Sequence, residues 1–117
     1  MQPSLSQFLL SAKGRISRSQ FWLRWALPYI VATVVLEILL FMLFDPWVAM
    51  ILLYVYLLAM LWPSIAVSIK RVHDRGRSGW FILLMVVPFL NIWVMIEMLF
   101  LPGTSGNNGY GADPATA

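Results

Sequence analysis

The stretch RVHDRGRSGW, residues 71–80, separates two long apolar runs and determines how the chain is divided. It holds three arginines, the one histidine of the chain, an aspartate and two glycines. The chain as a whole is 61% hydrophobic and only 11% charged, whereas an average soluble domain carries about 25% charged residues. A soluble domain of 117 residues leaves too much surface exposed to hide such a composition. The sequence therefore predicts an integral membrane protein with a polar loop at 71–80.

Turn and capping signals divide the chain into three apolar segments. Ser17 and Gln20 have the spacing of a capping box, which starts a helix. Asp45-Pro46 is a reversal signal, and Gly76 with Ser78 marks the end of one helix and the start of the next. The predicted helices cover residues 18–44, 46–74 and 79–101. Each is long enough for a bilayer core, which takes about 20 residues, so we expect an all-α fold with three transmembrane helices.

Prolines and the two ends of the chain predict departures from this simple scheme. Pro28 removes a backbone hydrogen bond and predicts a kink, and Pro63 interrupts the second helix. Ser64 is placed to bond a backbone group that Pro63 frees. Residues 1–17 are expected to be a cytoplasmic or interfacial segment, either a short surface helix or a frayed end. Residues 102–117 are expected to be an irregular tail of the same single domain, 1–117.

The placement of charge predicts an orientation. All Lys and Arg residues fall in two blocks, one before the first helix and one at the end of the second. The positive-inside rule places both blocks in the cytoplasm, so three spans put the N-terminus inside and the tail outside. An alternative is that Pro88-Phe89-Leu90-Asn91 turns the third segment back as two half-helices, with the tail inside. Irregular backbone at membrane depth then requires shelter from other helices.

Three motifs together resemble a known family. They are Gly14-Arg15-x-x-Arg18-x-x-Phe21-Trp22, then Arg71-Val72-His73-Asp74-x-Gly76-x-Ser78-Gly79-Trp80, then Pro102-Gly103-Thr104 with Gly106-x-Asn108-x-Tyr110-Gly111-x-Asp113-Pro114. In order and spacing they resemble the small bacterial inner-membrane proteins grouped as domain of unknown function 805. The resemblance implies an integral protein of the bacterial cytoplasmic membrane and implies no activity. Val72 stands where the family usually has Leu, and Gly109 where it often has a basic residue, which would favour a cytoplasmic tail.

The basic loop is the first candidate binding site. Its cations oppose the helix dipole and attract anionic lipid headgroups, at about 1 kcal/mol for each basic residue. Asp74 opposes both effects, so we expect it to pair with Lys70 and Arg71 one turn earlier. The loop either serves only to orient the protein or forms an anion site together with the first basic block. The residues of that site are Arg15, Arg18, Arg71, His73, Asp74, Arg75, Arg77 and Ser78.

The apolar segments contain a second candidate group, which consists of Glu37, Asn91 and Glu97. Ionisable side chains inside a bilayer are costly and often functional. One interpretation is a proton or cation pathway in a small oligomeric transporter or channel. The other, which we favour, is that the carboxyls are neutral through desolvation or hydrogen-bonded between helices.

The tail supplies a third group, Asn108, Tyr110 and Asp113, whose interest rests on the family resemblance. Asn108-Gly109 by itself predicts a tight turn.

No enzyme pattern emerges from these residues. His73 and Asp74 are adjacent on a helix and point about 100° apart, and the chain has no cysteine. A single histidine is also a poor start for a metal site. We expect no catalytic site, no metal and no cofactor, and no nucleic acid as a partner. The expected function is a non-enzymatic membrane protein that binds anionic lipid headgroups or a membrane partner, with a homo-oligomer left open.

Overall fold

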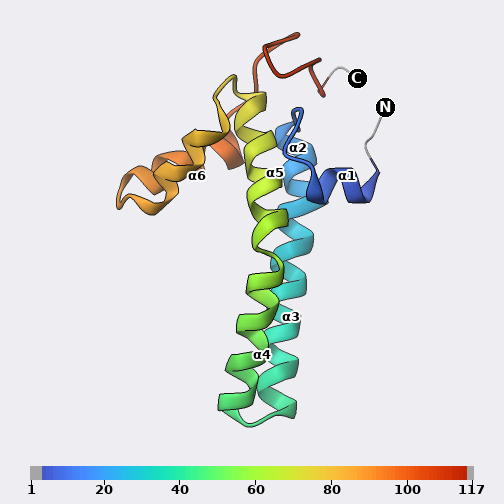
Figure 1. Ribbon diagram of the computed structural model, residues 1–117, viewed down its shortest axis with the longest axis vertical. Coiled ribbons are helices and arrows are strands. Elements are labelled where there is room, and N and C mark those ends of the chain that lie inside the picture. The colour runs from blue at the N-terminus through green and yellow to red at the C-terminus, as the bar shows by residue number, and fades with distance from the viewer. Residues whose placement is uncertain (1–3, 116–117) are drawn as a thin grey trace.

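The computed structural model describes residues 4–115, so three residues of the predicted N-terminal segment and two of the tail lie outside the described residues. Two long helical runs form an antiparallel hairpin, which we call the stem, and the two ends of the chain meet at one end of it (Figure 1). The elements are α1 (Leu5–Leu10), α2 (Arg18–Phe21), η1 (Trp22–Ala26), α3 (Leu27–Leu43), α4 (Pro46–Ala59), α5 (Leu61–Asp74), η2 (Gly79–Val86) and α6 (Leu90–Phe100). Of these, η1 is a π-helix and η2 a 3₁₀ helix.

The first predicted span is confirmed as one continuous helix of 26 residues, Arg18–Leu43, made of α2, η1 and α3. The predicted capping box is present: the Gln20 amide donates to Ser17 Oγ at 3.2 Å, and the Ser17 amide donates to Gln20 Oε1 at 2.8 Å. The predicted kink at Pro28 takes the form of the π-helical turn η1 directly before it. Pro28 has no N–H for the preceding turn, and a π-turn accommodates that loss without ending the helix. The run is about 39 Å long, enough for a hydrocarbon core of about 30 Å.

The second predicted helix is present as a bent pair, α4 and α5, with an angle of 41° between them, and the pair has the length and composition of a span if it is taken as one. The predicted interruption is confirmed, and it falls at Met60 rather than at Pro63 itself. Pro63 cannot donate to the carbonyl of Ala59, so the α4 hydrogen-bond ladder ends there. The Ser64 hydroxyl donates to the Met60 carbonyl at 2.8 Å, which also accepts the Ser64 amide at 3.0 Å, so this bond does not replace the one that Pro63 withholds from Ala59. After α5 the chain reverses at Gly76, whose φ of +81° suits glycine.

The predicted third transmembrane helix over 79–101 is wrong. After η2 the chain turns at residues 87–89 and returns as α6, packed against η2. Pro88 forces the residue before it out of helical geometry, and Val87 is extended at φ −96° and ψ 123°. Phe89 then adopts φ +68°. The structure contains the two half-helices of the alternative interpretation, η2 and α6, joined by the turn at residues 87–89. We call residues 79–100 the arm (Figure 1).

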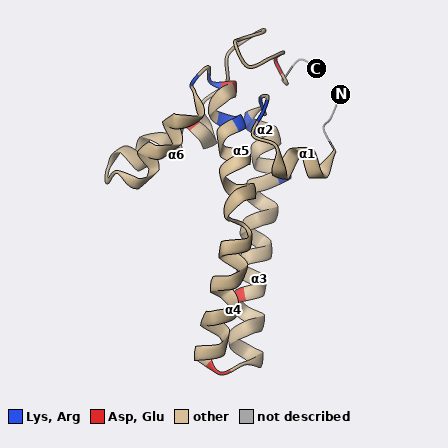
Figure 2. Ribbon diagram, in the orientation of Figure 1, with Lys and Arg blue, Asp and Glu red and all other residues tan. Residues whose placement is uncertain are grey.

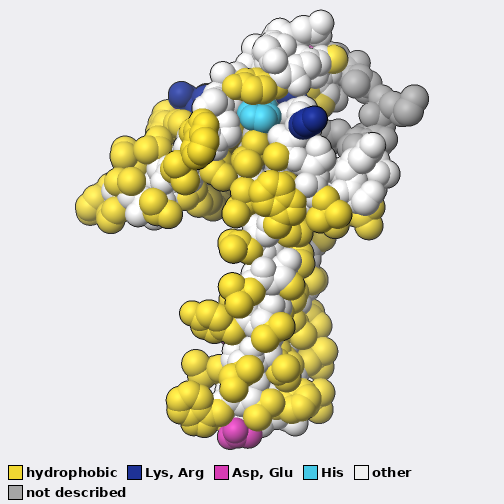
Figure 3. All heavy atoms as spheres, viewed as in Figure 1, with side chains coloured by type: hydrophobic (Ala, Val, Ile, Leu, Met, Phe, Trp, Pro, Cys, Tyr) yellow, Lys and Arg dark blue, Asp and Glu magenta, His cyan; other side chains and the backbone are white. Residues whose placement is uncertain are grey.

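The apolar core lies at the end of the stem where α1, α2, α5 and α6 meet. Its buried members are Phe8, Ile16, Phe21, Trp25, Ala26, Val67, Val72, Val94 and Met98. We call this end the head, defined as residues 4–26, 65–78 and 101–115. The stem itself is thin, with Leu40 the buried residue of α3 and Ala49 that of α4. Hydrophobic side chains cover the rest of the stem and the arm (Figure 3), as expected of surfaces that face lipid.

Candidate functional site: a polar network in the head

Side chains from α2, η1 and α5 bind five successive carbonyls at the end of α6. The last four carbonyls of a helix have no partner within the helix and form the negative end of its dipole. Four of the five contacts come from arginine side chains, whose guanidinium groups are charged. The contacts are Arg71 Nε to Met98 O at 2.8 Å, Trp22 Nε1 to Leu99 O at 2.6 Å, Arg18 Nη1 to Phe100 O at 2.6 Å, Arg71 Nη2 to Leu101 O at 2.5 Å and Arg75 Nη1 to Pro102 O at 2.5 Å. The arm is therefore attached to the stem through its backbone at α6.

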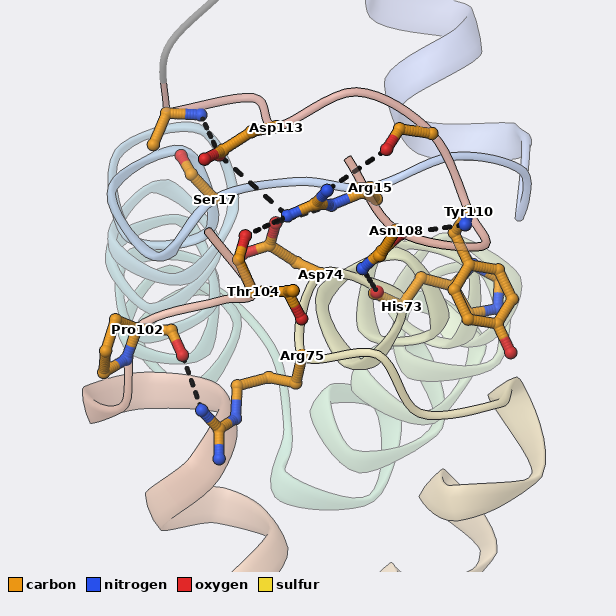
Figure 4. Close-up of polar contacts among 12 residues, drawn as sticks. Arg15, Ser17, His73, Asp74, Arg75, Pro102, Thr104, Asn108, Tyr110 and Asp113 are labelled. Carbon is orange, nitrogen blue, oxygen red and sulfur yellow. Dashed lines mark hydrogen bonds and ion pairs between the residues drawn. The ribbon is translucent and has the colours of Figure 1, made fainter. Parts of the chain in front are cut away.

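Asp74 is the centre of the network. Arg15 approaches its Oδ1 atom at 2.9 Å and Arg71 its Oδ2 atom at 2.9 Å, and all three side chains are at least 97% buried. The Asp74 carbonyl also accepts the Thr104 amide at 2.7 Å (Figure 4). Gly103 lies so close that an added Cβ would stand 1.9 Å from Asp74 Oδ2. A buried carboxylate needs such charged partners, because an unpaired charge there is strongly destabilising.

Arg15 holds the tail against the head. Its guanidinium donates to three tail carbonyls, those of Thr104 at 2.6 Å, Gly106 at 2.7 Å and Gly111 at 3.2 Å (Figure 4). Asp113 lies 3.9 Å from the same guanidinium. Hydrogen bonds from the amides of Ala115 and Gly106 hold the pKa of Asp113 below its ordinary value, so it is ionised at neutral pH. The tail thus folds around a cation from the N-terminal segment.

His73 and Tyr110 join the tail to α5 by ring stacking. Their ring centroids are 3.9 Å apart and the planes lie within 5° of each other. Asn108 Nδ2 donates to the His73 carbonyl at 3.0 Å, while His73 Nδ1 lies 3.0 Å from the Gly14 carbonyl. Asn108 and Gly111 exchange backbone hydrogen bonds of 3.0 and 3.2 Å, which confirms the predicted tight turn. These contacts attach the tail to α5, and His73, like Asn108, takes part in that attachment.

Glu97 binds the two arginines of the loop. Arg77 Nε and Nη2 contact Oε1 and Oε2 of Glu97 at 2.7 and 3.0 Å, and Arg75 Nε contacts Oε1 at 3.2 Å. Burial alone would raise the pKa of Glu97, but hydrogen bonds from Arg77 and Arg75 outweigh it and hold that pKa below its ordinary value. Of the two forms of the favoured interpretation, a neutral carboxyl or a hydrogen-bonded one, Glu97 shows the hydrogen-bonded form, with loop arginines as its partners. It lies beside the basic loop because α6 turns back toward the head.

Lys70 binds α1 instead of Asp74. Its ammonium donates to the carbonyls of Gln7 and Phe8 and lies 4.9 Å from the centre of the Phe8 ring. The Arg24 guanidinium lies 4.5 Å from the same ring, so the fully buried Phe8 has two cations over it. The predicted pairing of Asp74 with Arg71 is confirmed, and the pairing with Lys70 is wrong. The short surface helix predicted for the N-terminal segment is present as α1.

Comparison with known proteins identifies the family. The family model described as "Protein of unknown function (DUF805)" matches residues 9–112. The chain belongs to the DUF805 family. Inner membrane protein YhaI of Escherichia coli K12 is 37% identical over 102 residues, covering 86% of this chain and 83% of that protein. Inner membrane protein YhaH is 35% identical over 106 residues, with 87% and 85% coverage, and uncharacterized protein YiiR is 32% identical over 135 residues, with 94% and 90% coverage.

The names of these DUF805 relatives support a location in the bacterial inner membrane. No solved structure is similar enough to this chain to inform the comparison. The three motifs through which the sequence resembles DUF805 proteins converge in the head. The first supplies Arg15, Arg18 and Trp22, the second Arg71 to Arg77, and the third the tail residues that contact them. The sequence analysis missed Trp22 as a member of this network and missed the pairing of Arg15 with Asp74.

Some of the site residues predicted from sequence lie in this network, and others lie outside it. The structure brings together Arg15, Arg18, Arg71, His73, Asp74, Arg75, Arg77, Glu97, Asn108, Tyr110 and Asp113. Ser78 begins η2 at the edge of the arm, and Asn91 lies on the arm in an apolar recess of about 280 Å³. Glu37 lies on α3, about 28 Å of helix rise from Arg18, so the structure does not bring it next to Glu97. The tail contacts Arg15 and Asp74, so the predicted separation of the tail from the basic blocks by a third span is wrong.

An apolar groove opens between α5 and η2, where the arm meets the stem. Its volume is about 390 Å³, and its lining residues are Ile65, Ile69, Gly79, Trp80, Ile82 and Leu83. Arg77 precedes this lining by two residues and lies flat over the ring of Phe81, with 4.3 Å from guanidinium carbon to ring centre. The Arg77 side chain is 42% exposed, more than that of Arg75 at 23%. The groove thus has an apolar interior, and a partly exposed cation precedes its lining in the chain by two residues.

Proposed function

We propose that this chain is a two-span inner-membrane protein without enzymatic activity, whose head faces the cytoplasm and holds an anionic phospholipid of the inner leaflet. The observation that carries the proposal is the apolar groove between α5 and η2, whose lining begins at Gly79, two residues after the partly exposed Arg77. An acyl chain fits the apolar lining, and a phosphate group pairs with a guanidinium through two hydrogen bonds. A phospholipid supplies both parts in one molecule.

Charge supports the cytoplasmic orientation of the head. Every Lys and Arg lies at the head end of the molecule (Figure 2), whereas the turn between α3 and α4 has none. Eight basic residues face three acidic ones there, Asp74, Glu97 and Asp113. The positive-inside rule favours the cytoplasm for such an end, and the anionic inner leaflet attracts it further.

The apolar composition of the arm and its return to the head fit a position in the inner leaflet of the membrane. Its helix η2 is apolar throughout and α6 is apolar except for Asn91 and Glu97, and large side chains at its tip are strongly exposed, with Val86 at 82% and Phe89 at 85%. A helix that is apolar all round lies in lipid or in a protein core. The arm returns to the head before crossing, so we infer that it dips into the near leaflet and re-emerges on the same side. With the arm in this position, we expect the groove to lie at the depth of the acyl chains and Arg77 at the level of the headgroups.

Selectivity for an anionic lipid follows from charge balance at the groove edge. Arg75 and Arg77 share the single carboxylate of Glu97, so one positive charge remains. A phosphodiester with one negative charge complements it, whereas a zwitterionic headgroup adds a competing ammonium. Arg15, Arg18 and Arg71 are committed to Asp74 and to carbonyls, so they contribute less to lipid affinity than the sequence suggested.

The test is native mass spectrometry of the purified protein with equal amounts of phosphatidylglycerol and phosphatidylethanolamine. The proposal expects retention of phosphatidylglycerol and about a tenfold loss of it in Arg77→Gln, the value of one charge-assisted hydrogen bond. Lys13→Gln is the matched control, because Lys13 is an exposed cation of the head on a different loop. Glu97→Gln frees Arg77 and should increase retention. Equal retention of the two lipids, or equal retention by Arg77→Gln and the unmodified protein, contradicts the proposal.

A further inference from the structure

The stem presents an unusual residue to the membrane. Glu37 is exposed on α3, about 9 Å of helix rise before the end of the helix at Leu43. Its neighbours one turn away, Val34 and Phe41, are exposed and apolar. Ionisable side chains within spans almost always face a protein interior or a water-filled cavity, because lipid offers a carboxyl no hydrogen-bond partner. The hairpin alone provides no such interior at Glu37.

One side of α3 is already used for packing within the chain. Tyr29, Thr33 and Leu40 face α4: the Tyr29 ring lies 6.4 Å from that of Tyr56, the Thr33 hydroxyl lies 2.9 Å from the Tyr56 hydroxyl, and Leu40 is buried. With Leu36 between them, these positions have the alternating spacing of four and three residues that lines a helix–helix seam.

The adjacent positions repeat the same spacing and have no partner helix. They are Ile30, Val34, Glu37 and Phe41, and the three apolar members are 52%, 48% and 43% exposed. We call them the second seam. A single polar residue in an otherwise apolar seam is the arrangement that fixes register and partner number in helix pairs. In a membrane, interhelical hydrogen bonds between such residues serve the same purpose.

We propose that the second seam is a homodimer interface, in which Glu37 of one chain meets Glu37 of a second copy across a two-fold axis. A two-fold axis parallel to the membrane normal places like residues opposite each other, which is the symmetry of most dimers. Two facing carboxyl groups can hydrogen-bond each other across the axis, so neither is left unpaired in lipid. A partner of a different sequence would need its own polar group at the same depth, whereas a second copy supplies it by symmetry.

The absence of cysteine from the chain allows a direct test with matched single-cysteine variants. Val34→Cys lies in the second seam, and Val35→Cys is its control, because Val35 is equally exposed at 49% but points about 100° away. After oxidation in native membranes, the proposal expects disulfide-linked dimer from Val34→Cys and at least about five times less from Val35→Cys. Equal yields from the two variants, or no dimer from Val34→Cys even with a longer bifunctional maleimide, would overturn it.

A second step tests the role of the carboxyl. In the Val34→Cys background, Glu37→Leu removes the polar pair and keeps the face apolar, and the cross-linked fraction should fall about fivefold. Glu37→Gln keeps hydrogen bonding across the axis and should retain most of the cross-linking. An unchanged yield in Glu37→Leu refutes the carboxyl contact. The head provides an internal check of folding, since its thermal unfolding should be the same in all these variants. The dimer is independent of the lipid groove, so either proposal can fail alone.

Discussion

Replacing Gly103 with alanine tests whether the tail is locked onto Asp74. The added Cβ would stand 1.9 Å from Asp74 Oδ2, 2.4 Å from its Cγ and 2.8 Å from its backbone oxygen. Asp74 cannot move aside, because Arg15 and Arg71 hold both of its carboxylate oxygens. The tail must therefore retreat by about 1.5 Å to reach the ordinary contact distance of 3.4 Å.

That retreat breaks specific hydrogen bonds. The Thr104 amide now lies 2.7 Å from the Asp74 carbonyl, and the Thr104 carbonyl 2.6 Å from Arg15 Nη2. A shift of about 1.5 Å takes both beyond hydrogen-bonding distance. A neutral hydrogen bond contributes about 1 kcal/mol and one from a charged donor about 1.5–3 kcal/mol, so tail attachment should weaken by about 2–4 kcal/mol. The population of the detached tail then rises about 30- to 1000-fold.

Amide exchange of Thr104 measures this population. Threonine occurs only at positions 33, 104 and 116, so selective ¹⁵N-threonine labelling gives a simple spectrum, with Thr33 in the stem as an internal reference. Exchange through local opening should accelerate at Thr104 by the factor above and stay constant at Thr33. Gly109→Ala is the matched control, because nothing lies within 4 Å of its added Cβ. Unchanged exchange of Thr104 in Gly103→Ala, or equal acceleration in Gly109→Ala, would refute the attachment of the tail to Asp74.

Three further predictions concern the same network. Arg71→Leu should lower the free energy of unfolding by about 3–5 kcal/mol in detergent, since it leaves Asp74 buried with one partner fewer, while Lys13→Leu should stay within about 0.5 kcal/mol. Trp22→Phe removes the donor to the Leu99 carbonyl and should cost about 1–3 kcal/mol in the same measurement; no change would mean that this carbonyl is hydrated. The pKa of Glu97 lies below its ordinary value of 4.5, so its contribution to stability is complete above pH 4.5 and is lost as pH falls through the folded-state pKa. Thermal unfolding of Glu97→Gln should therefore depend less on acid pH than that of the unmodified protein, and parallel pH profiles would contradict the ion pair.

Local signals predicted the stem well. The capping box at Ser17 and Gln20 and the effect of Pro63 on α4 both act within about one helical turn, so the spacing of these residues in sequence determines how close they lie in space. The same holds for the pairing of Arg71 with Asp74.

The arm and the network could not be derived in the same way. Pro88 is compatible both with a kinked span and with a reversal, and the apolar sequence on either side is equally suitable for both. The choice fixes the position of Glu97, which lies in the outer leaflet for a span and beside Arg77 for a reversal. Arg15 and Asp74 are far apart in sequence, and no spacing rule pairs them. A useful signal was nevertheless present, because Asp74 opposes the helix dipole and therefore needs more than one cation.

The central claim is that both basic blocks and the tail share one side of the membrane, and single-cysteine labelling tests it most directly. Ser105→Cys lies in the tail, Ser78→Cys at the basic loop and Trp47→Cys at the turn between α3 and α4, where Trp47 is 74% exposed. Spheroplasts are treated with a membrane-impermeant maleimide, and lysed cells serve as the control. The two-span account expects labelling at Trp47→Cys and protection of both Ser78→Cys and Ser105→Cys until lysis. Labelling of Ser105→Cys in intact spheroplasts, with Ser78→Cys protected, would place a third span between them and contradict the account.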